Sequence, residues 1–486
     1  MRVLFVDIDT LRPDHMGCYG YMRNTTPNFD EIAKDGVRFD NYYCSDAPCL
    51  PSRAALISGM FGIHNGAVGH GGTAADRRIT GKDRSFTDVI DHNNFNNIFR
   101  KAGMYTASIS TFPERHSAFW FNAGFNETYN VGDGGLESGE KVLPVALDWI
   151  DRKGSEDNWF LHVHLWDPHT PYRAPLDFGN PFEKEPLPEW ITEEVLKDHM
   201  NHVGPHSISE INMYNDEENP EYPRHPGKAD DMKGLRRIID GYDTGVKYSD
   251  YIFGQVFDAL KEKGIFEDTA IIITSDHGEN LGELGIYGEH ATADHATCHI
   301  PMIIKWPEGK KNFVDKGLHY NIDICPTMAK LFGVEPYEKW DGISYAQSIT
   351  EGKDAGRNYL VVSQLAHVCQ RSVRFGDWLY MRTYHDGFHL FDKEMLFNLK
   401  EDLYEQNNLA SSMQEICDKA SRLLLEWNDD AMTSSDSPID PLWTVMSEGG
   451  PFHTIGCLDN YLARLRKTGR NQGAKELELR HKISTS

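Results

Sequence analysis

The chain has 486 residues, of which 40% are hydrophobic, so it can bury a large core in one big α/β domain with an appendage or in two domains. Its formal net charge of -25 argues against a nucleic-acid-binding surface, because phosphate backbones are bound by clustered Lys and Arg. An anionic substrate would need a local positive site such as a bound metal ion, since the overall field repels it.

The cysteines and the first residues bear on the compartment. Eight cysteines are scattered along the chain without a Cys-x-x-Cys pair, which favours reduced thiols over a disulfide framework. The opening MRVLFVDID holds a short apolar run with two acids, typical of a strand and not of a signal peptide. No segment approaches the roughly 20 apolar residues that span a bilayer. We expect a cytoplasmic location, unless a leader was trimmed, and no membrane partner.

Strands and helices alternate along the first part of the chain. A buried strand is predicted over residues 2–8, and a helix over TPNFDEIAKDGV, with Pro27 in its first turn and Gly36 at its end. Helix–strand pairs recur as FNNIFRKAGM with YTASIS, as VLPVALDWIDRKG with NWFLHVHLW, and as residues 232–264 with TAIIITSDHGE. This repetition predicts an α/β fold in which a large, mostly parallel sheet lies between helices.

The pattern changes after about residue 370. Apolar and polar residues alternate there between Gly and Asp turns, as in an antiparallel meander, and a helical segment follows. We therefore predict three parts: residues 1–370, residues 371–440 with a small antiparallel sheet plus helix, and a locally basic arm over residues 441–486. The arm either packs against its own chain or contacts a neighbouring subunit.

Acids and a histidine follow two predicted strands. Asp7 and Asp9 end the first strand, and Asp276 and His277 end the last one of the α/β region. Chemistry in such sheets gathers at the carboxyl ends of the strands. Carboxylate oxygens suit Ca²⁺, Mg²⁺ or Mn²⁺, and an added imidazole is compatible with Mn²⁺ or Zn²⁺. The alternative for each acid alone is a helix cap or a turn.

The stretch CLPSRAALISG places a cysteine at the start of a helix. Pro51 excludes the helical region for Leu50, so we expect Cys49 just before a helix that begins at Ser52. The free N–H groups of a helix N-terminus, with Arg53 beside them, would favour a thiolate as well as a sulfate or phosphate oxygen. An ordinary thiol nucleophile would need a histidine base, which the sequence alone does not place.

This stretch resembles the C-x-P-S-R signature of the sulfatase family, whose members convert the cysteine to formylglycine. Four further segments resemble family motifs in the same order: DTLRPDHMGCYGY and SDHGENLG its two metal loops, HLWDPHTPY its H-x-P-H-x-P segment, and DLYEQNNLA its C-terminal signature. The resemblance covers nearly the whole chain. It implies the alkaline phosphatase-like fold of the formylglycine-dependent, type I sulfatases, with residues 1–370 as the catalytic domain.

The resemblance implies a role for each matching residue. Cys49 resembles the formylglycine precursor, Arg53 the cation that orients its gem-diol, and His169 the substrate-binding histidine. One hydroxyl of the hydrated aldehyde attacks the sulfur and releases the alcohol; the other then loses its proton, and sulfate leaves as the aldehyde is regenerated. A divalent cation, Ca²⁺ by preference and Mn²⁺ or Mg²⁺ as alternatives, is held by residues that resemble the family's metal ligands: Asp9, Asp276, His277 and the oxidised Cys49.

Two segments depart from the family pattern. Asp9 is followed by Thr10, where many members have a second Asp, and we place the Asp7 side chain on the opposite face of the strand. The first loop then supplies one ligand, a pattern similar to phosphonate monoester hydrolases of the same superfamily. The GKWHLG segment is replaced by STFPERHSAFW, so that Arg115 or His116 is the candidate for the missing lysine.

A third departure lies in GIYGEHATADHATCHIP, where Glu289 occupies the place of a lysine that often binds the sulfate. The histidines beside it are His290, which we assign to catalysis with a buried structural role as the alternative, and His295, a weaker candidate for substrate binding. His70, in the glycine-rich GAVGHGG, is another weak candidate. The general acid is left open.

The leading expectation is a sulfuric ester hydrolase that cleaves a sulfate ester or sulfamate, with a saccharide sulfate as substrate and a formylglycine-generating maturation enzyme as partner. The first alternative is a phosphonate or phosphate mono- or diester hydrolase with the same nucleophile. The second is a non-catalytic anion-binding protein in which Cys49 is never oxidised. The arm leaves a homo-oligomer open.

Overall fold

The structure is a computed structural model that describes residues 1–79 and 88–482. Its main sheet runs in the order β11-β2-β10-β7-β1-β6-β4-β5. Among its described strands, only β10 is antiparallel to its neighbours, so the predicted, mostly parallel sheet is confirmed. The strands are β1 (Arg2–Ile8), β2 (Val37–Tyr43), β4 (Tyr105–Ile109), β5 (Glu127–Tyr129), β6 (Trp159–Leu165), β7 (Thr269–Thr274), β10 (Met302–Lys305) and β11 (Phe313–Tyr320).

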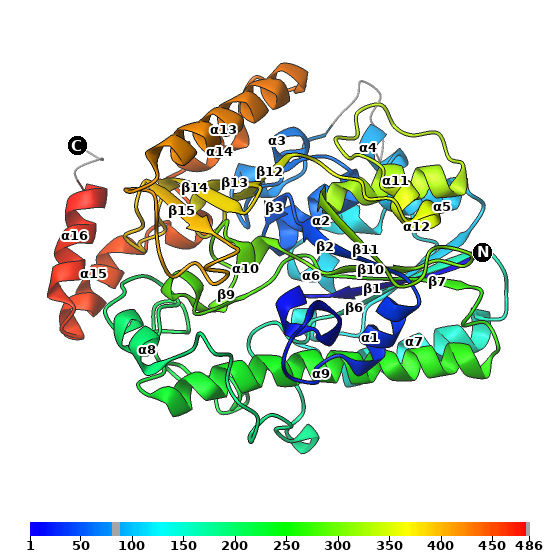
Figure 1. Cartoon of the computed structure of the whole chain (residues 1–486), viewed down its shortest axis with the longest axis horizontal. Coiled ribbons are helices and arrows are strands. Elements are labelled where there is room, and N and C mark those ends of the chain that lie inside the picture. Colours follow the sequence, from blue (N-terminus) through cyan, green and yellow to red (C-terminus); the bar gives the residue numbers. More distant parts are fainter. Residues whose placement is uncertain (80–87, 483–486) are drawn as a thin grey trace.

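Helices cover both faces of this sheet (Figure 1). On one face lie α1 (Pro27–Lys34), α7 (Gly139–Lys153) and α9 (Met232–Glu262), and on the other α2 (Cys49–Ser58), α5 (Phe95–Lys101) and α11 (Ile324–Phe332). Alternate residues of the central strand β1 enter the two cores, Val6 the first and Phe5 the second. A strand buried on both faces has to be apolar throughout, which explains the run that opens the sequence.

A second sheet follows in the order β15-β14-β13-β12-β3. The four strands β12 to β15 pair antiparallel, which confirms the predicted small antiparallel sheet, although β12 and the start of β13 lie before residue 371, and α13 (Gln414–Ser434) packs on this sheet. The short β3 pairs in parallel with β12 and directly precedes α2, which ties this sheet to the start of that helix. The strands are β3 (Asp46–Ala47), β12 (Tyr359–Gln364), β13 (Cys369–Phe375), β14 (Trp378–His385) and β15 (Glu394–Asn398).

The arm folds back onto its own chain. It contains α14 (Pro441–Ser447), α15 (Leu458–Lys467) and α16 (Asn471–Lys482), and residues 483–486 lie outside the described residues. Leu465 and Phe388 share one apolar cluster that joins α15 to the segment after β14. The remaining helices and strands are α3 (Gly62–Asn65), α4 (Val89–His92), α6 (Phe112–Arg115), α8 (Glu193–His199), α10 (His295–Cys298), α12 (Ala346–Glu351), β8 (Asn280–Leu281) and β9 (Tyr287–Glu289).

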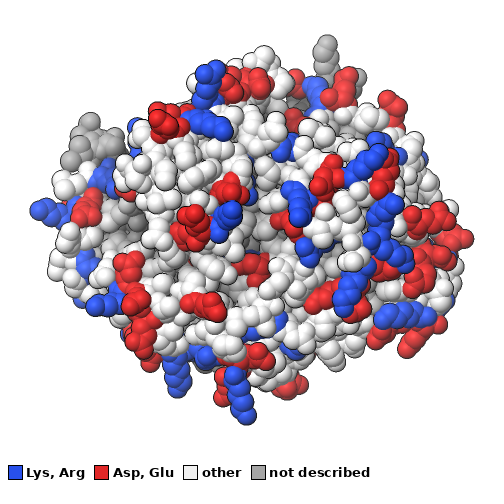
Figure 2. All heavy atoms as spheres, in the orientation of Figure 1, with Lys and Arg blue, Asp and Glu red and all other residues white. Residues whose placement is uncertain are grey.

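The surface carries charges of both signs. On the face shown in Figure 2, Lys and Arg side chains lie among Asp and Glu side chains. Among the helices of the described residues, none is long and apolar enough to cross a membrane.

Candidate active site

Four of the predicted residues meet at the carboxyl end of the main sheet. Asp9 follows β1, Asp276 and His277 follow β7, and Cys49 is the first residue of α2. The Nε2 atom of His277 lies 3.0 Å from Cys49 Sγ, 3.4 Å from Asp276 Oδ2 and 3.7 Å from Asp9 Oδ1. All four side chains are buried. With Arg53 and Asp7, described below, they form what we call the Cys49 centre.

The helix α2 presents Cys49 from a buried, fixed position. We predicted that the helix begins at Ser52, which is wrong: it begins at Cys49, because Pro51 in the first turn removes only an N–H that has no partner within the helix. The Ser52 hydroxyl donates to the backbone carbonyl of Asp276 at 2.6 Å, which fastens the first turn to the end of β7. Gly59, with a φ of 69°, ends the helix in the left-handed conformation.

Arg53, one turn into α2, is shared by three buried carboxylates. It contacts Asp7, lies 3.2 Å from both Asp9 and Asp276, and lies 2.9 Å from His164 Nε2. Our expectation that Asp7 lies on the opposite face of the strand from Asp9 is wrong, because residues two apart in a strand share a face, and both carboxylates reach Arg53. One guanidinium cannot neutralise three buried carboxylates, and an unpaired buried charge is costly.

The remaining charge fits a divalent cation. Asp9 Oδ1 and Asp276 Oδ2 are buried without a hydrogen-bond partner. The Nδ1 atom of His277 pairs with the Gly278 carbonyl at 2.8 Å, so Nδ1 carries the proton and the Nε2 lone pair faces the two carboxylates. Together with the side chain at position 49, these atoms form a group that could hold a metal ion. Oxygen donors with one imidazole suit a hard or borderline cation.

The electrostatics of the centre decide the state of the cysteine. Burial raises the pKa of Cys49 well above its usual value, and the charges of Asp9 and Asp276 raise it further. The expectation that the helix end and Arg53 favour a thiolate is therefore wrong for the unmodified side chain. Burial and the charge of Asp9 raise the pKa of Asp276, although Arg53 opposes them. An unmodified Cys49 is a neutral thiol here and a poor nucleophile.

Two further predicted residues lie beside the centre. The ring of His290 lies 4.2 Å from that of His277 and 5.3 Å from that of His169, measured between centroids. His290 Nε2 pairs with Glu289 Oε1 at 2.8 Å, while His290 Nδ1 is buried without a partner. Burial lowers the pKa of His290, but the charge and hydrogen bond of Glu289, together with the charges of Glu279 and Asp9, raise it overall. Burial lowers the pKa of His169, which is therefore neutral.

Glu289 also anchors a group of imidazoles from distant segments, which we call the Glu289 cluster. Its second oxygen, Oε2, lies 3.1 Å from His206 Nε2, and Oε1 lies 3.8 Å from His367 Nε2. His367 stacks on His453 of the arm, with centroids 4.1 Å apart, and His453 Nε2 lies 3.1 Å from His70 Nδ1. Sequence reasoning missed three of these histidines, because no motif or strand end marks their loops.

The other weak candidates for substrate binding, Arg115, His116 and His295, lie in different places. The Arg115 guanidinium lies 5.2 Å from the Trp166 ring, and His116 lies 6.5 Å from the same ring, with Nε2 buried and unpartnered. His295 instead stacks on His299 at 4.4 Å, and none of its contacts among the described residues is with the Cys49 centre.

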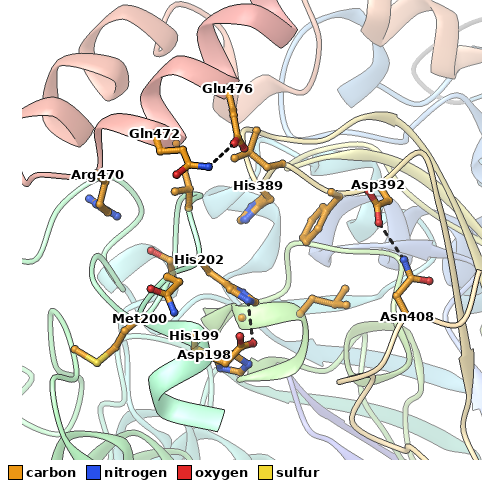
Figure 3. A pocket seen from close by; sticks show the side chains of 18 of the residues that line it. Asp198, His199, Met200, His202, His389, Asp392, Asn408, Arg470, Gln472 and Glu476 are labelled. Atoms are coloured by element: carbon orange, nitrogen blue, oxygen red, sulfur yellow. Dashed lines mark hydrogen bonds and ion pairs between the residues drawn. The ribbon is translucent and has the colours of Figure 1, made fainter. Parts of the chain in front are cut away.

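A cavity of about 790 Å³ lies between α8, the segment after β14 and the arm (Figure 3). His202, His389 and Arg470 line it, with Gln472 and Glu476 from α16. No residue of the Cys49 centre lines this cavity.

Comparison with known proteins identifies the family. The family model described as Sulfatase matches residues 2–334, more than half of the chain. A sulfatase from Formosa agariphila is 25% identical over 426 residues, which cover 80% of this chain and 80% of that protein. The chain belongs to the sulfatase family, and it is an enzyme of the sulfuric ester hydrolase class.

Solved structures share the fold. A protein solved in complex with its substrate D-glucosamine-2-N,6-O-disulfate superposes with a TM-score of 0.69 at 19% identity, covering 89% of this chain and 98% of that chain. The phosphonate monoester hydrolase of Agrobacterium radiobacter superposes with a TM-score of 0.69 at 20% identity, covering 88% of this chain and 96% of that chain. The fold is thus alkaline phosphatase-like, as the sequence predicted.

Proposed function

We propose that this enzyme is a formylglycine-dependent sulfatase that hydrolyses a sulfate ester or sulfamate of a carbohydrate. The observation that carries the proposal is the Cys49 centre, in which a buried, neutral cysteine begins a helix beside Asp9, Asp276 and His277. A thiol in that position is a poor nucleophile, whereas its oxidised form is the nucleophile of the family. The structural relative that binds a disulfated glucosamine supports the carbohydrate part.

The residues of the centre have separate tasks. Formylglycine at position 49, made by a formylglycine-generating enzyme, supplies the nucleophile. A divalent cation held by Asp9, Asp276 and His277 supplies Lewis-acid stabilisation of negative charge when bound, with Ca²⁺ the leading candidate. Arg53 holds the carboxylates in place and orients the side chain one turn before it. The N-terminal N–H groups of α2 add a partial positive charge toward a bound anion.

The histidines beside the centre supply a proton and a binding contact. The raised pKa of His290 favours the protonated ring, whose Nε2–H is directed to Glu289. Its Nδ1–H is then the free donor, placed to protonate the leaving oxygen of the alcohol. His169 is neutral and binds the substrate through a hydrogen bond. Weaker substrate contacts are assigned to His70, His116 and Arg115.

A second candidate function is hydrolysis of a phosphonate or phosphate ester with the same nucleophile. It is favoured by the single metal-binding acid of the first loop, Asp9, since Asp7 is engaged by Arg53. The similar TM-score of a phosphonate monoester hydrolase agrees with it.

The mass of the tryptic peptide that contains Cys49 tests the proposal, using protein made with a formylglycine-generating enzyme. We expect a mass about 18 Da below that of the thiol. Cys49→Ala should abolish hydrolysis, while Cys325→Ala, a buried cysteine that donates to the Leu56 carbonyl of α2, should keep it. An unmodified thiol with full activity would overturn the mechanism. Rates on nitrophenyl sulfate and nitrophenyl phosphonate decide between the two functions.

A further inference from the structure

The Glu289 cluster contains a second group of side chains that could bind a metal ion, outside the Cys49 centre. His206 comes from the loop after α8, Glu289 from β9, and His367 from the loop between β12 and β13. Each is less than one-tenth exposed, at 6%, 8% and 6%. One nitrogen of each imidazole and one carboxylate oxygen lie within 4.8 Å of one another. Three segments far apart in the chain thus converge on one buried point.

The tautomer of His206 leaves a lone pair facing an anion. Its Nδ1 lies 2.8 Å from the Ile211 carbonyl, which can only accept, so Nδ1 carries the proton. Its Nε2 lies 3.1 Å from Glu289 Oε2 but makes no hydrogen bond, and it is buried without a partner. A nitrogen lone pair beside a carboxylate oxygen is repulsive unless a cation lies between them. Metal-bound histidines show this arrangement, with the distal N–H on a backbone carbonyl.

We propose that His206, Glu289 and His367 bind a second cation, a divalent transition ion of the Zn²⁺ class. Two imidazoles with one carboxylate form the ligand set of several zinc and non-haem iron sites, whereas Ca²⁺ and Mg²⁺ prefer oxygen. Donors about 2.1 Å from one ion lie at most about 4.2 Å apart. Glu289 Oε2 lies 3.1 Å from His206 Nε2, and Glu289 Oε1 lies 3.8 Å from His367 Nε2, so each histidine is within that limit of one oxygen of the same carboxylate.

The ion would link two parts of the molecule to the Cys49 centre. Glu289 uses Oε2 toward His206 and Oε1 toward His290, so a cation on the first oxygen fixes the carboxylate that orients the His290 ring. The His206 loop is itself fastened to the arm, because Arg470, visible in Figure 3, binds Glu210 at 2.7 Å. Three protein ligands leave a position open for water or for a substrate group.

Metal titration tests the site without relying on turnover. The full chain carrying Asp276→Asn, which disables the Cys49 centre, is dialysed against a chelator and titrated with Zn²⁺ by calorimetry and with Co²⁺ by visible absorption. We expect one ion per chain. Adding His206→Gln should weaken binding at least about 100-fold. The matched control is His199→Gln, a buried histidine seven residues earlier whose two nitrogens pair with Tyr287 and Gln406; it should change little.

A second substitution guards against misfolding. His367→Gln should weaken Zn²⁺ binding as His206→Gln does, and each variant with Asp276 intact should keep the circular dichroism spectrum and the cation affinity of the Cys49 centre. Absence of Zn²⁺ binding in the Asp276→Asn chain would overturn the proposal, and so would binding that neither histidine substitution changes. Failure here leaves the formylglycine result untouched, since the two are measured separately.

Discussion

Two regions of the molecule bury carboxylates beside arginines, in opposite proportions. In the Cys49 centre, the single cation Arg53 is shared by three carboxylates. Where the arm meets the loop after α8, the single carboxylate of Glu210 receives two guanidinium groups, Arg464 at 2.7 Å and Arg470 at 2.7 Å, and the hydroxyl of Tyr461 at 2.5 Å. The same side-chain types thus leave an excess of negative charge in the Cys49 centre and no such excess around Glu210.

The two regions also differ in whether their carboxylate oxygens have hydrogen-bond partners. Asp9 Oδ1 and Asp276 Oδ2 have no hydrogen-bond partner, whereas both oxygens of Glu210 accept hydrogen bonds. A buried carboxylate whose donors are complete fastens two segments together. A buried carboxylate that lacks donors is destabilising until a cation from outside the chain binds to it. Binding of that cation removes the unfavourable energy of the unpaired charge, and the cation is therefore bound more tightly.

The largest effect is expected from Asp9→Asn. The amide removes one negative charge and one anionic ligand, so the chain should lose most of its divalent-cation affinity. kcat/KM should fall at least about 1,000-fold, or about 4 kcal/mol. Calorimetric titration with Ca²⁺ and steady-state kinetics measure both. The control is Asp40→Asn, a half-buried acid paired with Arg38 at 2.9 Å, which should behave as wild type. Unchanged Ca²⁺ affinity in the Asp9 variant would show that Asp9 is not a ligand of the cation.

Glu210→Gln should affect stability instead of metal binding. The neutral amide leaves two guanidinium groups without their anion, and because both are partly exposed we expect a loss of about 2–3 kcal/mol in the free energy of unfolding. Denaturant unfolding measures it. Asp216→Asn, which removes an exposed partner of Arg464, should cost under about 1 kcal/mol. If Glu210→Gln weakened Ca²⁺ binding as strongly as Asp9→Asn, the distinction between the two regions would fail.

The Cys49 centre could be predicted from the sequence because its residues stand at places that the fold fixes. Asp9 and Asp276 follow central strands, and Cys49 begins a helix in a recognisable signature. The details that failed depend on neighbours: the side on which Asp7 lies, and the charge state of a thiol surrounded by acids. The hydrophobic pattern of the sequence predicts where a strand ends. It does not predict which charged side chains from other segments surround that end.

The Glu289 cluster could not be predicted for a different reason. Its ligands His206 and His367 lie in loops, and His453 lies in the arm, so that only the packing of distant segments brings them to Glu289. The sequence marked Glu289, which we expect at the place of a lysine of the family, but it did not show the imidazoles that surround Glu289. Glu289 could be singled out in the sequence, but its histidine partners could be identified only from the tertiary structure.

The smallest predicted effect is a pH dependence of stability at the contact between the arm and the segment after β14. Burial alone would raise the pKa of Asp386, but His481 and then Arg480, both in α16, hold it well below its usual value. For an acid with a depressed pKa, the stabilising contribution is complete above its ordinary pKa of 3.8 and is lost as the pH falls below that value. Asp386→Asn should therefore cost about 2 kcal/mol of unfolding free energy at pH 7.

The pH dependence of the stability difference between wild type and Asp386→Asn tests this prediction. The gap in unfolding free energy between wild type and Asp386→Asn should narrow as the pH falls from 5 toward 3, because the Asp386 carboxyl of the unfolded wild-type chain then gains a proton, while the folded chain keeps it ionised and paired with Arg480 and His481. Asp418→Asn, an exposed acid on α13, should show no such gap at any pH. A gap that stays constant down to pH 3 would mean that shape and hydrogen bonding, and not charge, fasten α16 to the segment after β14.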